Sequence, residues 1–269
     1  PLARDMVRHP GSRRRVLKAM LALGGVSVLS LSWWQAPAMR QWSNILLADH
    51  GTQTGERQRV MLADGGQLWL NSASAVNINY KARKRLIELI SGEVWIETAR
   101  DTQQPPRPLS VHTRHGVLTA LGTRFAVRDQ GQVVHVAVFE GAVEVRPHHG
   151  LGKPVVGAGR QASFNAGQSG PIQAADPAMQ SWLKGMLVAD NLPLAEVVGW
   201  LGSYFRGHLA CDPAVATLRV VGAFPLDDLD RVLHTLAQTL PIKVNRLLPW
   251  WITLEPLDHV AHHVSKATR

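Results

Sequence analysis

The most informative segment of the chain is residues 116–127, which read Gly116-Val117-Leu118-Thr119-Ala120-Leu121-Gly122-Thr123-Arg124-Phe125-Ala126-Val127. Apolar and polar residues alternate along it, and this period of two is typical of a β-strand with one buried face. Gly122 interrupts the pattern, and glycine adopts backbone angles that other residues avoid. The Thr123 hydroxyl follows the Gly122 carbonyl directly, so it can attack that carbonyl if the peptide is strained. The simpler interpretation is a glycine bulge in a β domain.

The same alternation continues on both sides and predicts an all-β domain over residues 52–176. Turn-forming residues such as Ala63-Asp64-Gly65-Gly66, Ser91-Gly92 and Asp129-Gln130-Gly131 separate short runs of strand. Strands of this length and spacing form either a sandwich or a stacked solenoid. The predicted strands are 58–62, 67–70, 75–80, 85–90, 93–98, 109–113, 117–121, 123–128, 133–139 and 142–145.

Residues 182–256 change in character and predict a small α+β domain with the order β-α-β-β-α-β-β. Pro193 is expected to open one amphipathic helix, and Asp227 is expected to cap a second. The predicted strands of this domain are 186–188, 208–210, 218–221, 242–245 and 251–254.

Three leucines of this domain, Leu187, Leu194 and Leu201, fall at heptad spacing. Pro193 interrupts the first interval, so a helix core is a better interpretation than a coiled coil. The same leucines are the candidate partner-binding positions of the domain. Residues 257–269 contain three histidines, and we expect a solvated tail there rather than a metal site.

The charge of the chain is concentrated near its N-terminus. Seven Lys and Arg residues and one Asp lie in residues 1–40, so this segment carries +6 of the formal net charge of +9. Such a distribution indicates a membrane flank rather than a nucleic-acid groove. The single Cys211 excludes an intrachain disulfide. The sequence shows neither metal-ligand spacing nor a nucleophile–base signature, so we expect no metal, no cofactor and no enzyme that turns over a substrate.

Residues 16–34 are apolar enough to be a short membrane span, preceded by a basic cytoplasmic segment at residues 1–15. Arg13 and Arg14, within Ser12-Arg13-Arg14-Arg15-Val16-Leu17-Lys18, resemble a twin-arginine export signal, with Val in place of the more usual Phe. Ala36-Pro37-Ala38 also fits a signal-peptidase site, so a cleaved signal peptide is the alternative to an anchor.

Several short motifs together resemble the FecR family of iron-siderophore sensor proteins. The resemblance extends from about Arg14 to Pro256, and the chain is identified as a member of this family on the combination rather than on any one motif. The motifs are Leu62-Ala63-Asp64-Gly65 with Leu70-Asn71, Ser91-Gly92-Glu93, Leu118-Thr119-Ala120-Leu121-Gly122-Thr123-Arg124-Phe125, Ala142-Val143-Glu144-Val145, Cys211-Asp212-Pro213-Ala214-Val215-Ala216 and Gln238-Thr239-Leu240-Pro241.

The resemblance implies a single-pass inner-membrane regulator with a cytoplasmic N-terminus and a periplasmic body. It implies an extracytoplasmic-function sigma factor as one partner and the periplasmic signalling domain of a TonB-dependent outer-membrane receptor as another. Periplasmic and intramembrane proteases are further implied partners, and nucleic acid is not. Residues 182–256 resemble the secretin/TonB short N-terminal fold, which docks on the receptor in this family.

The resemblance also implies self-cleavage between Gly122 and Thr123, a single event in each chain rather than turnover. The family carries a longer cytoplasmic domain before the span than the residues from Pro1 to Ser12 provide. The chain opens with Pro1 rather than Met, so we expect a fragment or a processed product. Either the sigma-binding domain is missing from this sequence, or the protein senses without one. The alternative function is an exported periplasmic module that binds a ligand or cell-wall glycan without cytoplasmic output.

Overall fold

The structure is a computed structural model that describes residues 48–257. The chain divides into two units, residues 1–47 and residues 48–269, and the description concerns the second. The predicted span 16–34 and the export signal at Arg13 and Arg14 lie outside the described residues. Within residues 48–257, no helix combines the length and the hydropathy that a bilayer crossing requires.

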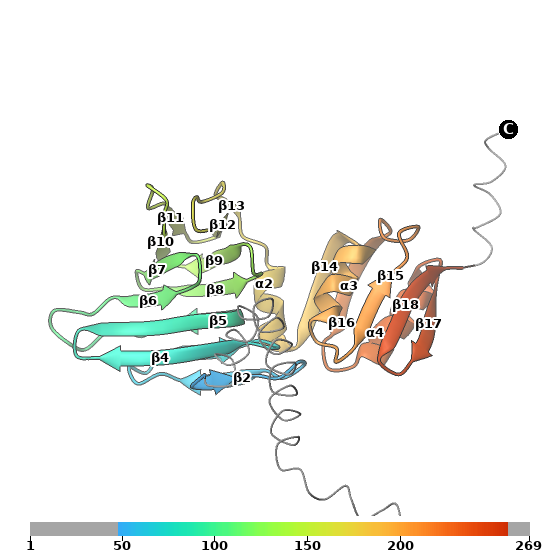
Figure 1. Ribbon diagram of the computed structural model, residues 1–269, viewed down its shortest axis with the longest axis horizontal. Coiled ribbons are helices and arrows are strands. Elements are labelled where there is room, and N and C mark those ends of the chain that lie inside the picture. Colours follow the sequence, from blue (N-terminus) through green and yellow to red (C-terminus); the bar gives the residue numbers. More distant parts are fainter. Residues whose placement is uncertain (1–47, 258–269) are drawn as a thin grey trace, which may run out of the picture. The chain divides into compact units, whose positions relative to one another are not determined.

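Residues 50–174 form one continuous hydrogen-bonded sheet of thirteen strands, coloured blue to olive in Figure 1. This confirms the predicted all-β domain, and most strands lie within a residue or two of their predicted positions. The strands are β1 (His50–Gly51), β2 (Gln58–Met61), β3 (Gln67–Leu70), β4 (Ala75–Lys81), β5 (Lys84–Glu97), β6 (Leu109–His112), β7 (Gly116–Ala120), β8 (Arg124–Asp129), β9 (Val134–Glu140), β10 (Ala142–Pro147), β11 (Val155–Gly157), β12 (Arg160–Phe164) and β13 (Gln173–Ala174).

Strand β5 passes through two layers of the sheet. Its first half pairs with β4 and β6, and its second half pairs with β3 and β8. Side chains from both halves, including Ile87, Leu89, Val94 and Ile96, belong to one hydrophobic core. Two layers that face each other across a shared core form a sandwich, so the solenoid alternative does not apply.

The predicted turn at Ser91-Gly92 is wrong, because β5 continues through it. The side chains that enter the sandwich core change there from odd positions, Ile87 and Leu89, to even positions, Val94 and Ile96. The strand thus presents apolar residues to the same core on both sides of the bend. Gly92 has a φ of +84°, and an added Cβ would lie 2.3 Å from Ser74 Oγ. Glycine at this position therefore marks a corner in a continuous strand rather than its end.

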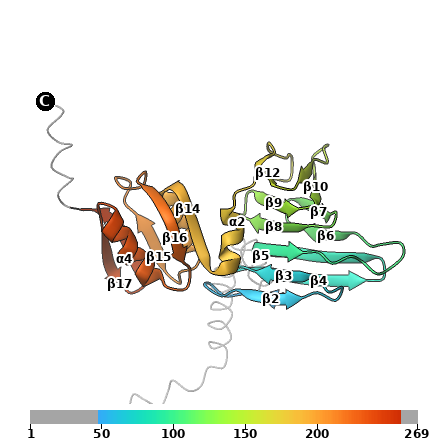
Figure 2. The same ribbon diagram turned by 180° about the vertical axis from the view of Figure 1, so that it is seen from behind.

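The remaining residues form the predicted α+β domain, coloured yellow to red in Figure 1 and seen from behind in Figure 2. Its strands form the sheets β14-β16 and β15-β18-β17, and its helices supply buried apolar residues between them. The elements are α2 (Ala178–Ser181), the 3-10 helix η1 (Trp182–Lys184), β14 (Met186–Pro193), α3 (Leu194–Gly202), β15 (His208–Cys211), β16 (Arg219–Pro225), α4 (Leu229–Thr239), β17 (Ile242–Leu248) and β18 (Trp251–Pro256).

The start of α4 differs by one residue from the prediction. Asp228, not Asp227, is the N-cap, and its Oδ1 accepts a hydrogen bond from the Arg231 backbone N–H at 2.9 Å. Asp227 instead forms an ion pair with Arg57 of the segment before β2 at 2.5 Å. A tertiary partner therefore decides which of two adjacent carboxylates is free to cap the helix.

Candidate functional site

The Gly122-Thr123 peptide lies in the tight connection between β7 and β8. Gly122 has a φ of +75°, the left-handed conformation that glycine adopts without strain, while Leu121 beside it is 58% exposed. Thr123 is only 3% exposed. Its Oγ1 is buried and has no hydrogen-bond partner among the residues that the structure describes. A buried hydroxyl without a partner is costly, so it is a candidate for a chemical role.

Gly141, in the turn between β9 and β10, packs closely against this peptide. A Cβ on Gly141 would lie 2.1 Å from the Gly122 carbonyl oxygen and 2.9 Å from Thr123 Cγ2. Gly141 itself has a φ of +74°. Only glycine at position 141 permits this close approach, whereas a Cβ on Gly122 would meet nothing within 4 Å. Only Gly122 was predicted from the sequence as a special position.

Thr98, directly after β5, holds the backbone of Thr123 from the other side. Thr123 N–H donates to Thr98 Oγ1 at 2.7 Å, and Thr98 N–H donates to the Thr123 carbonyl at 3.0 Å. The Thr98 hydroxyl can also donate to that carbonyl, at 3.2 Å. The scissile nitrogen of the proposed cleavage is therefore already paired with a hydroxyl oxygen.

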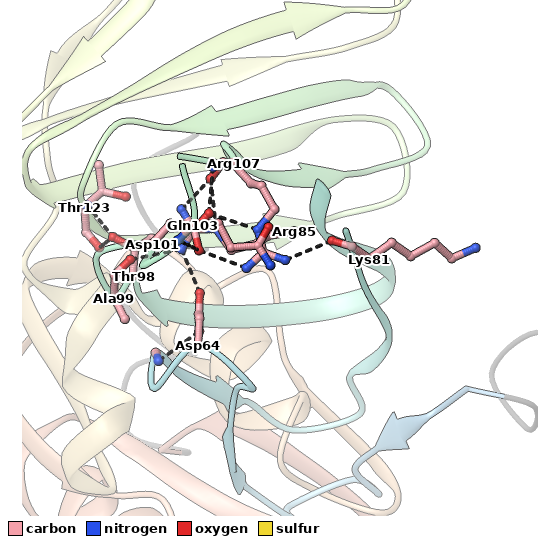
Figure 3. Close-up of polar contacts among 10 residues, drawn as sticks. Asp64, Lys81, Arg85, Thr98, Ala99, Asp101, Gln103, Arg107 and Thr123 are labelled. Carbon is pink, nitrogen blue, oxygen red and sulfur yellow. Dashed lines mark hydrogen bonds and ion pairs between the residues drawn. The ribbon is translucent and has the colours of Figure 1, made fainter. Parts of the chain in front are cut away.

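A buried polar network fixes the segment that follows Thr98, as Figure 3 shows. Arg85 donates to Asp64 at 2.7 Å, to the Ala99 carbonyl at 3.0 Å and to the Arg107 carbonyl at 3.0 and 2.8 Å. Arg107 binds Asp101 through its guanidinium at 2.8 and 2.9 Å. These hydrogen bonds hold the pKa of the Asp101 carboxyl well below its usual range. The network fixes residues 98–107 against the sandwich and so positions Thr98.

The histidines that precede and follow Thr123 most closely in the sequence, His115 and His135, lie away from it. His135 pairs in register with Arg128, five residues beyond Thr123 along β8, and its Nε2 contacts Gln130 Oε1 at 2.9 Å. His115 Nε2 contacts the Gly131 carbonyl at 2.8 Å. Five strand residues span about 17 Å, so neither imidazole reaches Thr123 in this structure.

The structure places the candidate partner-binding leucines in the core. Leu194 and Leu201 of α3 are 0% and 2% exposed, as expected for a helix core, and Leu187 of β14 is 2% exposed. None of the three offers a surface to a partner in this conformation. Apolar side chains that do reach the surface gather at the turn between β17 and β18, where Leu247 is 73% and Trp250 54% exposed. The sequence signal was available, since Leu247-Leu248-Pro249-Trp250-Trp251 places four large apolar residues around a turn-forming proline.

No group of three or more His, Cys, Asp or Glu side chains within residues 48–257 could hold a metal ion. Cys211 is a free thiol of intermediate exposure. The grooves described within this range have volumes of about 310 to 390 Å³.

Comparison with known proteins places this fold. The family model described as FecR protein matches residues 48–144. Two crystal structures of a proposed anti-sigma factor from Parabacteroides distasonis ATCC 8503 have the same fold, each with a TM-score of 0.62 and 23% identity. They cover 77% and 76% of this chain, and the chain covers 97% of each of them. No curated protein sequence matches the chain significantly.

Proposed function

Because this chain belongs to the FecR family through its residues 48–144, we propose that it regulates a sigma factor by protein–protein contact. The family match on the sandwich carries this proposal. The shared fold with a proposed anti-sigma factor supports it, since the similarity continues beyond the matched residues into the α+β domain. The proposed partner is an extracytoplasmic-function sigma factor, bound through a cytoplasmic part of the protein.

The signal that this regulator relays is proposed to come from a TonB-dependent outer-membrane receptor carrying an iron siderophore. In this arrangement the described body lies in the periplasm, the segment 16–34 anchors it in the inner membrane, and proteases later release the cytoplasmic part. The test uses the full natural protein with the sigma factor of the same cell. Co-purification of the two, and loss of sigma-dependent reporter control on deletion of the regulator, are expected. A reporter indifferent to the deletion would refute the proposal.

The α+β domain is the proposed receptor contact, and the turn between β17 and β18 is its most exposed apolar part. Replacing Leu247 or Trp250 with Ser removes exposed apolar surface and leaves the core intact. We expect the receptor's periplasmic signalling domain to be retained at least several-fold less in a pull-down, with an unchanged thermal midpoint. Exposed Met61 of β2, which is 63% exposed on the sandwich, provides a matched control as Met61→Ser. Equal retention of all three variants would contradict this contact.

Self-cleavage between Gly122 and Thr123 is the second part of the proposal. Thr123 Oγ1 attacks the Gly122 carbonyl carbon, the C–N bond breaks as the ester C–O bond forms, and the hydroxyl proton passes to the liberated amine. Water then hydrolyses the ester, which leaves a carboxylate on Gly122 and a free amino group on Thr123. The buried Thr123 hydroxyl, without a hydrogen-bond partner among the described residues, supports this step.

We expect Thr123→Ala to abolish cleavage and Thr123→Ser to retain it, since serine keeps the attacking hydroxyl. Thr119→Ala on β7 is the matched control and should cleave normally. Intact mass after purification gives the fragment boundaries. A two-fragment pattern that persists in Thr123→Ala, or a boundary elsewhere in the chain, would exclude this chemistry.

A further inference from the structure

A polar seam joins the sandwich to the α+β domain. Glu93 of β5 accepts from Trp182 Nε1 at 3.2 Å and from Asn71 Nδ2 at 2.9 Å. Asn71 Oδ1 accepts in turn from the Tyr204 hydroxyl at 2.8 Å. One carboxylate therefore connects β5 directly to η1 and, through Asn71, to the residues that follow α3. Two of the sequence motifs, Leu70-Asn71 and Ser91-Gly92-Glu93, meet at this point.

Apolar side chains surround the seam and favour its closure. Trp95 lies two residues beyond Glu93 on the same face of β5 and is 3% exposed, although that face points away from the sandwich core. It shares a second hydrophobic cluster with Ala126 and Ala137 of the sandwich and with Met179 and Trp182 of the other domain. Separation of the two domains would return this surface to water, which is unfavourable.

The Glu93 carboxylate opposes that closure. Glu93 is 5% exposed, and its burial raises its pKa, against the opposing influence of the Arg128 charge. The Arg128 guanidinium carbon lies 4.3 Å from the centroid of the Trp200 ring, so Arg128 interacts with this ring as well as with the Glu93 carboxylate. An ionised carboxylate loses its hydration when it is buried, and two neutral donors recover only part of that loss. Opening the seam would let water hydrate the Glu93 carboxylate again.

A groove of about 360 Å³ lies beside the seam and is lined by Asn71, Glu93, Arg128 and Ser203, among others. Ser72 Oγ donates to the Ser203 carbonyl across the same boundary at 2.6 Å. The polar contacts between the domains therefore border a space that water can enter, and they are not sealed within a dry core.

We propose that this seam is a releasable clasp: the Glu93 carboxylate holds Trp182 and, through Asn71, Tyr204 while the domains are closed, and its rehydration favours their separation as folded bodies. Opposed contributions of apolar burial and charge desolvation keep the closed and open arrangements close in free energy. Opening uncovers Trp95 and Trp182 together. The clasp is a property of the described body and does not depend on the sigma-factor role.

Hydrogen exchange of the full chain, measured by mass spectrometry at neutral pH, tests the clasp without any partner. Trp182→Phe removes the donor to Glu93 and keeps most of the ring, and Tyr204→Phe removes the donor to Asn71. In both variants we expect exchange at residues 70–74 and 178–186 to become roughly ten-fold faster, as the loss of one buried hydrogen bond implies. Exchange in β10 and α4, far from the seam, should not change.

Tyr80→Phe is the matched control for the loss of a ring hydroxyl, because Tyr80 lies on β4 and packs against the sandwich core, away from the seam. It should leave exchange at the two seam segments close to that of the unsubstituted protein. If Trp182→Phe and Tyr204→Phe behave like this control, the clasp does not exist. If faster exchange spreads to β10 and α4, the seam is part of one cooperative core and the domains do not separate as folded bodies.

Discussion

The buried ion pair between Arg85 and Asp64 gives the sharpest test of how the sandwich is held together. The two side chains are 8% and 4% exposed, and their charged atoms lie 2.7 Å apart. Arg85 also donates to the carbonyls of Ala99 and Arg107, so Arg85→Met removes four hydrogen bonds and one positive charge. Asp64 would then keep the Gly66 backbone N–H as a donor, at 3.0 Å.

The expected magnitude follows from that geometry. Removing one partner of a buried pair leaves the other charge uncompensated and costs about 3–5 kcal/mol. For a body of this size, that corresponds to a fall of roughly 6–20 °C in the thermal midpoint. Asp64→Asn should also destabilise the fold. The double variant Asp64→Asn with Arg85→Met should lose less stability than the two single variants added together, because no unpaired carboxylate remains in it. The expected coupling is about 0.5–3 kcal/mol.

Urea unfolding of the full chain, followed by tryptophan fluorescence, measures these differences. Arg146→Met is the matched control, since Arg146 is 54% exposed and pairs with Glu144 at the surface. It should change the free energy of unfolding by no more than about 0.5 kcal/mol. A cost below about 1 kcal/mol for Arg85→Met, or strict additivity with Asp64→Asn, would refute the reasoning.

Two further predictions concern a helix cap and a buried acid. Asp228→Ala should lower the free energy of unfolding by about 1 kcal/mol, because it removes the cap of α4. Asp227→Ala should lower it by less, because the ion pair of Asp227 with Arg57 is largely exposed. Equal losses in urea unfolding would contradict this assignment. Burial raises the pKa of Glu93 above 4.5, so the native state binds the extra proton and the free energy of unfolding should decrease as pH rises above 4.5. Glu93→Gln should remove this part of the slope; identical slopes would exclude it.

Local pattern was sufficient for most of the fold. Alternation located β3 at residues 67–70 without error, and the helix signals placed α3 directly after Pro193. The pattern failed where contacts with distant residues determine the local structure. These places are the corner of β5 at Gly92 and the N-cap of α4. Strands β1, β11 and β13 were not predicted, because they have only two or three residues each and alternation cannot show in so short a run. Strand β12 was also not predicted, because its core side holds only Ala162 and Phe164.

The candidate site could be predicted only in part, for the same reason. Gly122 was identified because its conformational freedom is a property of the residue itself. Thr98 and Gly141 were not, since they meet Thr123 only after β5, β8 and the β9–β10 turn have assembled. Similarly, the heptad spacing of Leu187, Leu194 and Leu201 could not distinguish a core face from a contact face, and burial resolved it in favour of the core.

The order of strands in the sandwich determines what a break at Gly122 would do. Strands β5, β6 and β7 come from the chain before this position, and they are flanked by β8 on one side and β10 on the other, both from the chain after it. The two pieces are therefore interlaced, with backbone ladders along both flanks and a common interior. A cut there would nick the body without dividing it, and separating the pieces would require force or unfolding rather than simple diffusion.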